Sequence, residues 1–266
     1  MDVAHDPEYL YLAVAHCQWT AVTIGVSAML QTIDMAIREI HIGLWFLVVG
    51  YYFFLFLFLL FFRWRKSRNP FQLAMALFFL LLAIGRAFYF VGDFYADSRS
   101  LYGDLVTKFD VFLPELQPWL QAGSFFQWMA LAILAATAGF MIFGQKWAEI
   151  LFAAPAIIIG IALGIVPMDD WTRQLISGVA GPVYALFIPF LFWYLAYQSG
   201  GILRRSNFVL GLGFLVLFAG RVVHAGRFWL QANVFGTLTV PGILAPGLIV
   251  IGLIFIAIGN EWGQTQ

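Results

Sequence analysis

The sequence alternates between short polar connections and apolar segments of roughly twenty residues, each long enough to cross about 30 Å of hydrocarbon as a helix. Hydrophobic residues make up 62% of the chain and charged residues only 11%. A soluble domain has about half apolar and a quarter charged residues, because its core must be covered by polar surface. The sequence therefore predicts an all-α integral membrane protein surrounded by the lipid bilayer.

Seven of the apolar segments predict a seven-transmembrane-helix bundle. The connections, such as Arg63–Pro70 and Gly200–Ser206, carry charges or helix breakers. Residues 40–266 are predicted to form one transmembrane domain without an appended soluble module. The predicted spans are Ile40–Phe62, Phe71–Phe94, Leu116–Phe143, Ala148–Val166, Leu175–Tyr197, Phe208–Leu230 and Pro241–Ile258.

Residues 1–39 are predicted to form an extracytoplasmic segment with an amphipathic helix. Polar side chains within 16–38 recur every three or four positions, which places them on one face of a helix. This helix either lies along the outer membrane surface or forms an eighth span with its polar face inward. The surface position is favoured because no Pro or Asn within 26–40 marks a tight turn. The polar positions are His16, Thr20, Thr23, Ser27, Gln31, Asp34 and Arg38.

The distribution of basic residues indicates the orientation of the bundle. Lys146 lies in the third connection, Arg204 and Arg205 lie in the fifth, and the alternate connections are mainly acidic. Because Lys and Arg mark cytoplasmic connections, the amino terminus is predicted outside the cell membrane and the carboxyl terminus in the cytoplasm. The first connection carries the strongest signal, with Arg63, Arg65, Lys66 and Arg68.

Two parts of the chain resemble each other. Each is a short basic segment followed by an apolar run, which ends in Gly85-Arg86 in one case and Gly220-Arg221 in the other. The matching helices are the second and sixth spans, which predicts two parallel three-helix units joined by one helix, a 3+1+3 plan. Apolar helices with few residue types also match by chance, and the remaining spans align poorly.

Charged residues within the spans are the first candidates for a binding site. Arg86 and Arg221 lie in otherwise apolar helices, where an isolated charge is costly. Asp93 follows Arg86 by two helical turns, and His224 follows Arg221 by one. Arginine suits a carboxylate or phosphate through paired hydrogen bonds. The alternative is that these arginines pair with acidic residues such as Asp93 and only hold helices together.

Polar residues also follow one face of the third span. Gln117, Gln121, Ser124 and Gln127 recur every three or four residues, and polar groups in lipid must find partners. Three helices thus place polar groups at one depth, which predicts an outward-facing polar cavity or a closed polar network. Hydrogen bonds that only fix helix packing are the alternative. The candidate ligand-binding residues are Arg86, Asp93, Gln121, Gln127, Arg221 and His224.

Several chemistries lack the residues they need. A retinal Schiff base requires an intramembrane lysine, and all three lysines lie in or beside connections. The single cysteine, Cys17, excludes an internal disulfide and a multi-cysteine metal or iron–sulfur site. His41 and His224 are the candidates for axial haem ligands, but each span offers at most one histidine, which disfavours haem. No metal site or enzyme motif is found, and the cofactor stays open.

These features predict a sensor- or receptor-like protein that binds a small polar or anionic ligand and signals through a protein partner in the membrane or cytoplasm. A small-solute transporter of 3+1+3 plan and a non-catalytic subunit of a larger membrane complex are the alternatives. The net charge of zero and the lack of a basic tract exclude nucleic acid as a partner. The layout is similar to that of seven-helix receptors and small transporters, but layout alone does not assign function.

Overall fold

The structure, a computed structural model, describes residues 39–94, 117–166, 168, 172, 175–235 and 239–262. Apart from residues 39 and 40, they belong to one compact unit, His41–Gln266. Every regular element within these ranges is helical, as the all-α prediction requires. The predicted amino-terminal amphipathic helix lies outside the described residues.

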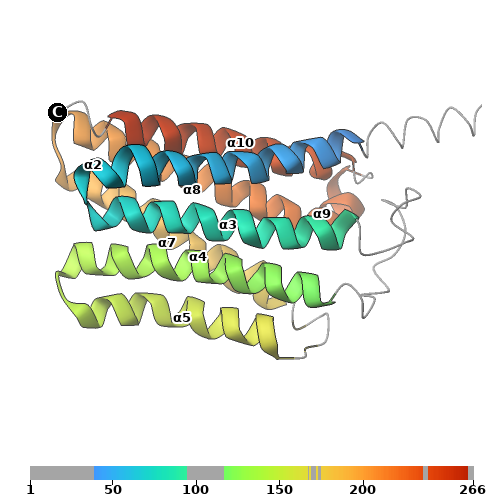
Figure 1. Cartoon of the computed structure of the whole chain (residues 1–266). Helices are drawn as coiled ribbons and strands as arrows, with labels where there is room; N and C mark the ends of the chain where they lie inside the picture. The colour runs from blue at the N-terminus through green and yellow to red at the C-terminus, as the bar shows by residue number, and fades with distance from the viewer. Residues whose placement is uncertain are drawn as a thin grey trace, which may run out of the picture. The chain divides into compact units, whose positions relative to one another are not determined.

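Six helices are long and apolar enough to cross a membrane. Figure 1 shows them lying side by side, with α3, α4 and α5 in sequence along one side of the bundle. The six are the first helix (Glu39–Ser67), α3 (Pro70–Phe94), α4 (Gln117–Phe143), α5 (Lys146–Ile165), α8 (Gly201–Ala225) and α10 (Thr239–Trp262).

The remaining helical elements are shorter. A helix of wider turns, η3 (Ile176–Ala180), leads directly into α7 (Gly181–Gln198), and α8 is followed by α9 (Arg227–Leu230) and η4 (Gln231–Phe235). The first helix ends in η1 (Phe58–Trp64) and α2 (Arg65–Ser67). A helix therefore lies at each of the seven predicted positions, but α7 is not among the six that are long and apolar enough to cross.

Two connections are shorter than the sequence predicted. The first helix continues to Ser67 and α8 begins at Gly201, so the predicted connections Arg63–Pro70 and Gly200–Ser206 were wrong at these ends. The chain reverses near left-handed residues, Arg68 with φ 54° and Gly201 with φ 59°. Long basic side chains extend past the end of an apolar segment to reach polar surroundings, so they do not require the helix to stop.

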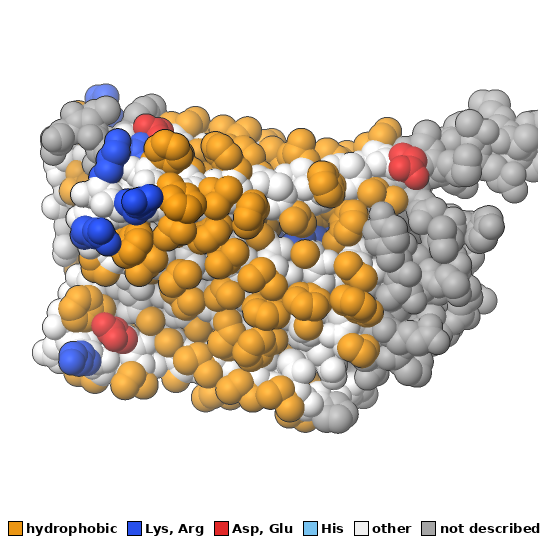
Figure 2. Space-filling view, in the orientation of Figure 1, with side chains coloured by type: hydrophobic (Ala, Val, Ile, Leu, Met, Phe, Trp, Pro, Cys, Tyr) orange, Lys and Arg blue, Asp and Glu red, His pale blue; other side chains and the backbone are white. Residues whose placement is uncertain are grey.

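The surface of the bundle separates into a basic end and an apolar belt. Figure 2 shows the Lys and Arg side chains of this face gathered mainly at one end, with apolar side chains covering the length of the helices beside them. At this end Arg63 forms an ion pair with Glu261 of α10. Phe46, Ile150 and Ile158 are 71%, 70% and 66% exposed, as expected of a surface that faces lipid.

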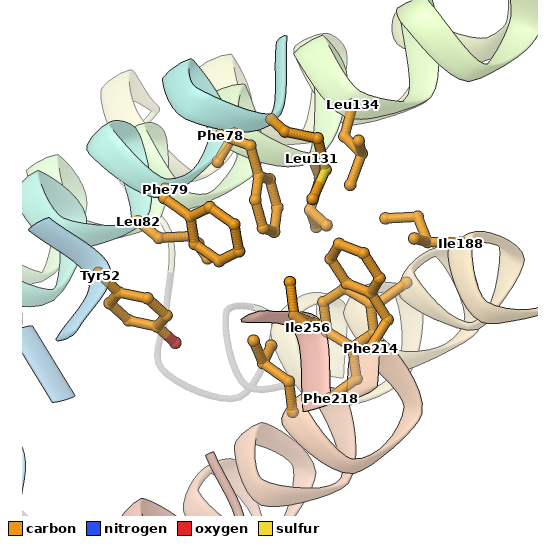
Figure 3. Close-up of a cluster of buried hydrophobic side chains, with 14 of the residues drawn as sticks. Tyr52, Phe78, Phe79, Leu82, Leu131, Leu134, Ile188, Phe214, Phe218 and Ile256 are labelled. Carbon is orange, nitrogen blue, oxygen red and sulfur yellow. The ribbon is translucent and has the colours of Figure 1, made fainter. Parts of the chain in front are cut away.

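Aromatic side chains from three helices meet at the centre of the bundle (Figure 3). Phe78 of α3 contacts Phe214 of α8 edge to face, with ring centroids 5.7 Å apart. Phe192 of α7 stacks on the same ring at 5.3 Å. All three rings are fully buried, and each such pair contributes about 0.5–1.5 kcal/mol beyond its buried area. These contacts join α3, α7 and α8.

Helices α8 and α10 cross at a close distance. A Cβ atom added to Gly252 would lie 2.6 Å from the Leu217 nitrogen and 2.7 Å from the Gly213 carbonyl oxygen. Because glycines have no side chains, the two helix backbones approach closely at these positions and gain dispersion contacts. The Ser206 hydroxyl adds a buried hydrogen bond, donated to the Gly259 carbonyl oxygen at 2.7 Å.

We expect Gly252→Ala to lower the free energy of unfolding by about 1–3 kcal/mol, because the added methyl group meets backbone atoms that cannot move aside. Gly247→Ala is the matched control, since it lies in the same helix and its Cβ would meet nothing within 4 Å. The control should be neutral or slightly stabilising. Thermal unfolding of both variants in detergent micelles measures the difference, and equal midpoints would contradict the close crossing.

Candidate functional site

A buried guanidinium lies at the junction of three helices. Arg86 of α3 is only 4% exposed, and its guanidinium carbon lies 3.3 Å from the centre of the Trp45 ring on the first helix. One of its terminal nitrogens lies 3.2 Å from Nε2 of His224 on α8. An aromatic face is worth about 2 kcal/mol to a desolvated cation, which offsets part of the cost of burying the charge.

Trp45 is held in place by two histidines. Its indole nitrogen donates to Nε2 of His41, one turn earlier on the same helix, at 2.9 Å. Its ring meets that of His224 edge to face, with centroids 4.6 Å apart. Nε2 of His41 is thus engaged with Trp45 and Nε2 of His224 faces Arg86, so this arrangement does not present either nitrogen to a haem iron.

His224 also receives a second arginine. A terminal nitrogen of Arg227 lies 3.1 Å from Nε2 of His224, and the same nitrogen donates to the His224 carbonyl oxygen at 3.3 Å. Guanidinium groups can only donate hydrogen bonds, so the shared imidazole nitrogen must accept them. Arg86 and Arg227 are therefore linked through one imidazole ring.

The third arginine contacts α4. Arg221, one turn before His224, donates to the side-chain oxygen of Gln127. Gln127 reaches α8 because α3 and α4 touch at a glycine: a Cβ atom added to Gly85 would lie 2.8 Å from Cγ of Gln127 and 2.9 Å from the Gly123 carbonyl oxygen. We call Arg86, Arg221 and Arg227, together with their partners His224 and Gln127, the arginine cluster.

A second polar link joins α3 to α4 beside the cluster. The hydroxyl groups of Tyr89 and Ser124 lie 2.6 Å apart, and Ser124 is 4% exposed. Ser124 and Gln127 belong to the polar face predicted on the third span, and both turn toward the bundle interior as expected. Gln121 of the same face is half-buried, and the described residues offer it no hydrogen-bond partner.

The structure brings four of the six predicted ligand-binding residues into one cluster: Arg86, Gln127, Arg221 and His224. Gln121 lies outside it, and the side chain of Asp93 lies outside the described residues. Arg86 contacts the side chains of Trp45 and His224 directly. This arrangement resembles the predicted closed polar network more than the predicted outward-facing cavity. Arg221 and Arg227 are only half-buried, so part of each side chain remains accessible.

Sequence reasoning missed two aromatic members of the site. Trp45 covers the guanidinium of Arg86, and the Tyr89 ring lies 5.9 Å from the same group. Their spacing carried a signal, because Trp45 is one turn after His41 and Tyr89 is one turn after Arg86. An aromatic residue one turn from an intramembrane polar group is a candidate partner for a charge on its own helix or on a neighbouring helix.

The helices define a class of protein before any ligand is considered. Six apolar helices with an apolar outer surface indicate a multi-pass helical membrane protein in a lipid bilayer. No protein family, curated protein or solved structure matches the chain. Within the described ranges, no group of three His, Cys, Asp or Glu residues is placed to hold a metal ion. The arginine cluster is therefore the basis for a functional proposal.

Proposed function

We propose that this protein binds a small organic anion, a carboxylate or a phosphate ester, at the arginine cluster and acts as a membrane sensor or receptor. The observation that carries the proposal is Arg221. Its described partner is the neutral amide of Gln127, its guanidinium has further donors, and its side chain keeps accessible surface. A planar guanidinium whose remaining donors have no partner among the described residues suits the two oxygens of a carboxylate or phosphate.

The charge of the cluster supports the same class of ligand. Arg86 and Arg227 each place a nitrogen near Nε2 of His224, at 3.2 and 3.1 Å. Both positive charges therefore lie beside the same imidazole ring, and like charges about 6 Å apart repel by about 3 kcal/mol at an effective dielectric of about 20. Arg221 adds a third positive charge one turn away. An anion placed among the three converts this repulsion into attraction.

Binding is tested by thermal unfolding of the purified protein in detergent, with acetate, succinate, inorganic phosphate or glycerol phosphate compared against chloride at equal ionic strength. We expect one of these anions to raise the unfolding midpoint with saturation, because a ligand at 100 times its Kd adds about 2.7 kcal/mol. Arg221→Gln should weaken the affinity for that anion by about tenfold, because one charge-assisted contact is lost.

The control for this measurement is Arg65→Gln, which removes a charge from an exposed residue at the basic end. It should leave the midpoint shift unchanged. If no anion stabilises the protein beyond chloride, or if Arg221→Gln responds like the unaltered protein, the cluster is only a structural network.

We also propose that α7, extended by η3, crosses the membrane as a seventh span, with the amino terminus outside and the carboxyl terminus in the cytoplasm. The helical run 176–198 is comparable in length to the six apolar helices. Phe192 of α7 is buried against Phe214 of α8, so α7 packs beside a candidate span. The basic end of the bundle supports the orientation, because Lys and Arg mark the cytoplasmic side.

Topology is tested with single cysteines in a Cys17→Ser background. A membrane-impermeant maleimide should label Val234→Cys in intact cells, and Ser67→Cys and Gln198→Cys only after the cells are opened. Gln198 and Ser67 lie at the ends of α7 and the first helix, and all three positions are exposed. Labelling of Gln198→Cys but not Ser67→Cys in intact cells would contradict a crossing by α7.

A small-solute transporter is the second candidate, and the helix packing favours it. The glycine before each arginine lies at a close contact with the third helix of its predicted unit. An added Cβ would lie 2.9 Å from the Gly123 carbonyl oxygen at Gly85 and 2.8 Å from the Ala245 carbonyl oxygen at Gly220. The pairs α3–α4 and α8–α10 thus share one packing feature, which supports the 3+1+3 plan of two parallel units.

Flux separates the two candidates. Proteoliposomes are loaded with buffer and given the radiolabelled anion that stabilises the protein most. Transport predicts saturable uptake that falls by about tenfold with Arg221→Gln, because the residue contacts the solute during passage. Sensing predicts saturable binding without uptake. Neither binding nor uptake, together with co-purification of a defined protein, would indicate a non-catalytic subunit instead.

A further inference from the structure

A groove lies between the carboxyl end of α7 and the amino end of α8, far along α8 from the arginine cluster. Its volume is about 1040 Å³, and its walls combine aromatic and basic side chains. It is distinct from the arginine cluster, because Arg204 and Arg205 lie in the first turns of α8 whereas Arg221 and His224 lie in its last turns. The residues that matter for its chemistry are Trp193, Tyr197, Arg204, Arg205, Phe208 and Val209.

The basic wall of the groove carries uncompensated charge. Arg204 and Arg205 are exposed, and neither forms an ion pair with any residue that the structure describes. Both lie in the first turns of α8, where the helix dipole disfavours cations. The preceding Gly200 offers no side-chain cap to the first backbone N–H groups. Two guanidiniums and open N–H donors at one position together favour a bound anion.

The other wall is apolar and held in position. The Trp193 ring stacks on Phe208 with centroids 6.3 Å apart, and its indole nitrogen donates to the Phe208 carbonyl oxygen at 3.3 Å. The ring packs against Gly211, where an added Cβ would lie 2.6 Å from it. Tyr197 is 85% exposed at the same end of α7. Trp and exposed Tyr of this kind are enriched where a membrane protein meets the headgroup region.

We infer that the α7–α8 groove binds an anionic phospholipid, with its phosphate at Arg204 and Arg205 and an acyl chain along Trp193 and Phe208. A soluble anion would use only the arginines and leave the apolar wall without a partner. A neutral lipid would use only the wall and leave both charges uncompensated. A single anionic lipid matches both walls, and basic residues beside membrane helices recognise such headgroups.

The inference is tested with the full chain in detergent, titrated with phosphatidylglycerol or phosphatidylcholine and observed by native mass spectrometry. Phosphatidylglycerol should bind at least about tenfold more tightly than phosphatidylcholine, because only its headgroup carries net negative charge. In R204Q/R205Q this preference should fall below about threefold. The matched control R65Q/K66Q removes two exposed basic residues at another helix end and should keep the preference.

Two further measurements separate this inference from weaker explanations. Glycerol phosphate, the headgroup without acyl chains, should bind at least about tenfold more weakly than the lipid when both are titrated into Arg221→Gln, which weakens anion binding at the arginine cluster; equal binding to this variant would overturn the lipid assignment. Val209→Trp, which fills the groove without changing charge, should also reduce phosphatidylglycerol binding. If R65Q/K66Q loses as much preference as R204Q/R205Q, the protein attracts anionic lipid only through its overall basic end, and the groove is not a site. Unfolding midpoints in phosphatidylcholine confirm that each variant is folded.

Discussion

The structure depends on how a charged arginine is accommodated inside an apolar bundle. Arg86 is buried at a helix junction, where protein groups surround it. Trp45 covers its face and His224 meets its edge, and these residues come from two other helices. A single side chain of α3 therefore contacts both the first helix and α8. Anion binding, as proposed here, uses the charge that this arrangement retains.

Close helix packing and the polar contacts are coupled. Gly85 lets α4 approach α3, and this approach brings Gln127 to Arg221 on α8. Gly220, directly before Arg221, lets α10 approach α8 in the same way. A glycine beside each arginine thus combines a tight helix contact with a polar contact across the interior. Dispersion and hydrogen bonding, the forces that associate helices in lipid, therefore act at the same level of the bundle.

The positions of the helices were predictable, whereas their ends and their polar partners were not. Blocks of apolar residues identify a helix wherever a span is needed, because lipid leaves the backbone no other way to satisfy its polar groups. The sequence predicts that the first helix ends before Arg63 and that the sixth begins after Arg204, because basic residues are typical of connections. Both residues lie within helices, since a long basic side chain reaches polar surroundings from inside a helix. The inward face of Ser124 and Gln127 followed from their spacing, but their partners Tyr89 and Arg221 depended on which helices became neighbours.

By itself, the sequence determined that the chain forms apolar helices suited to a membrane and that Arg86 and Arg221 need polar or aromatic partners within the bundle. Composition and period decide these points, because each depends only on residues along one helix. Only the tertiary structure decided that Trp45 and His224 are the partners of Arg86, and that Gln121 lies outside the arginine cluster. Such choices depend on how helices rotate and cross, which is decided by packing between segments far apart in the chain.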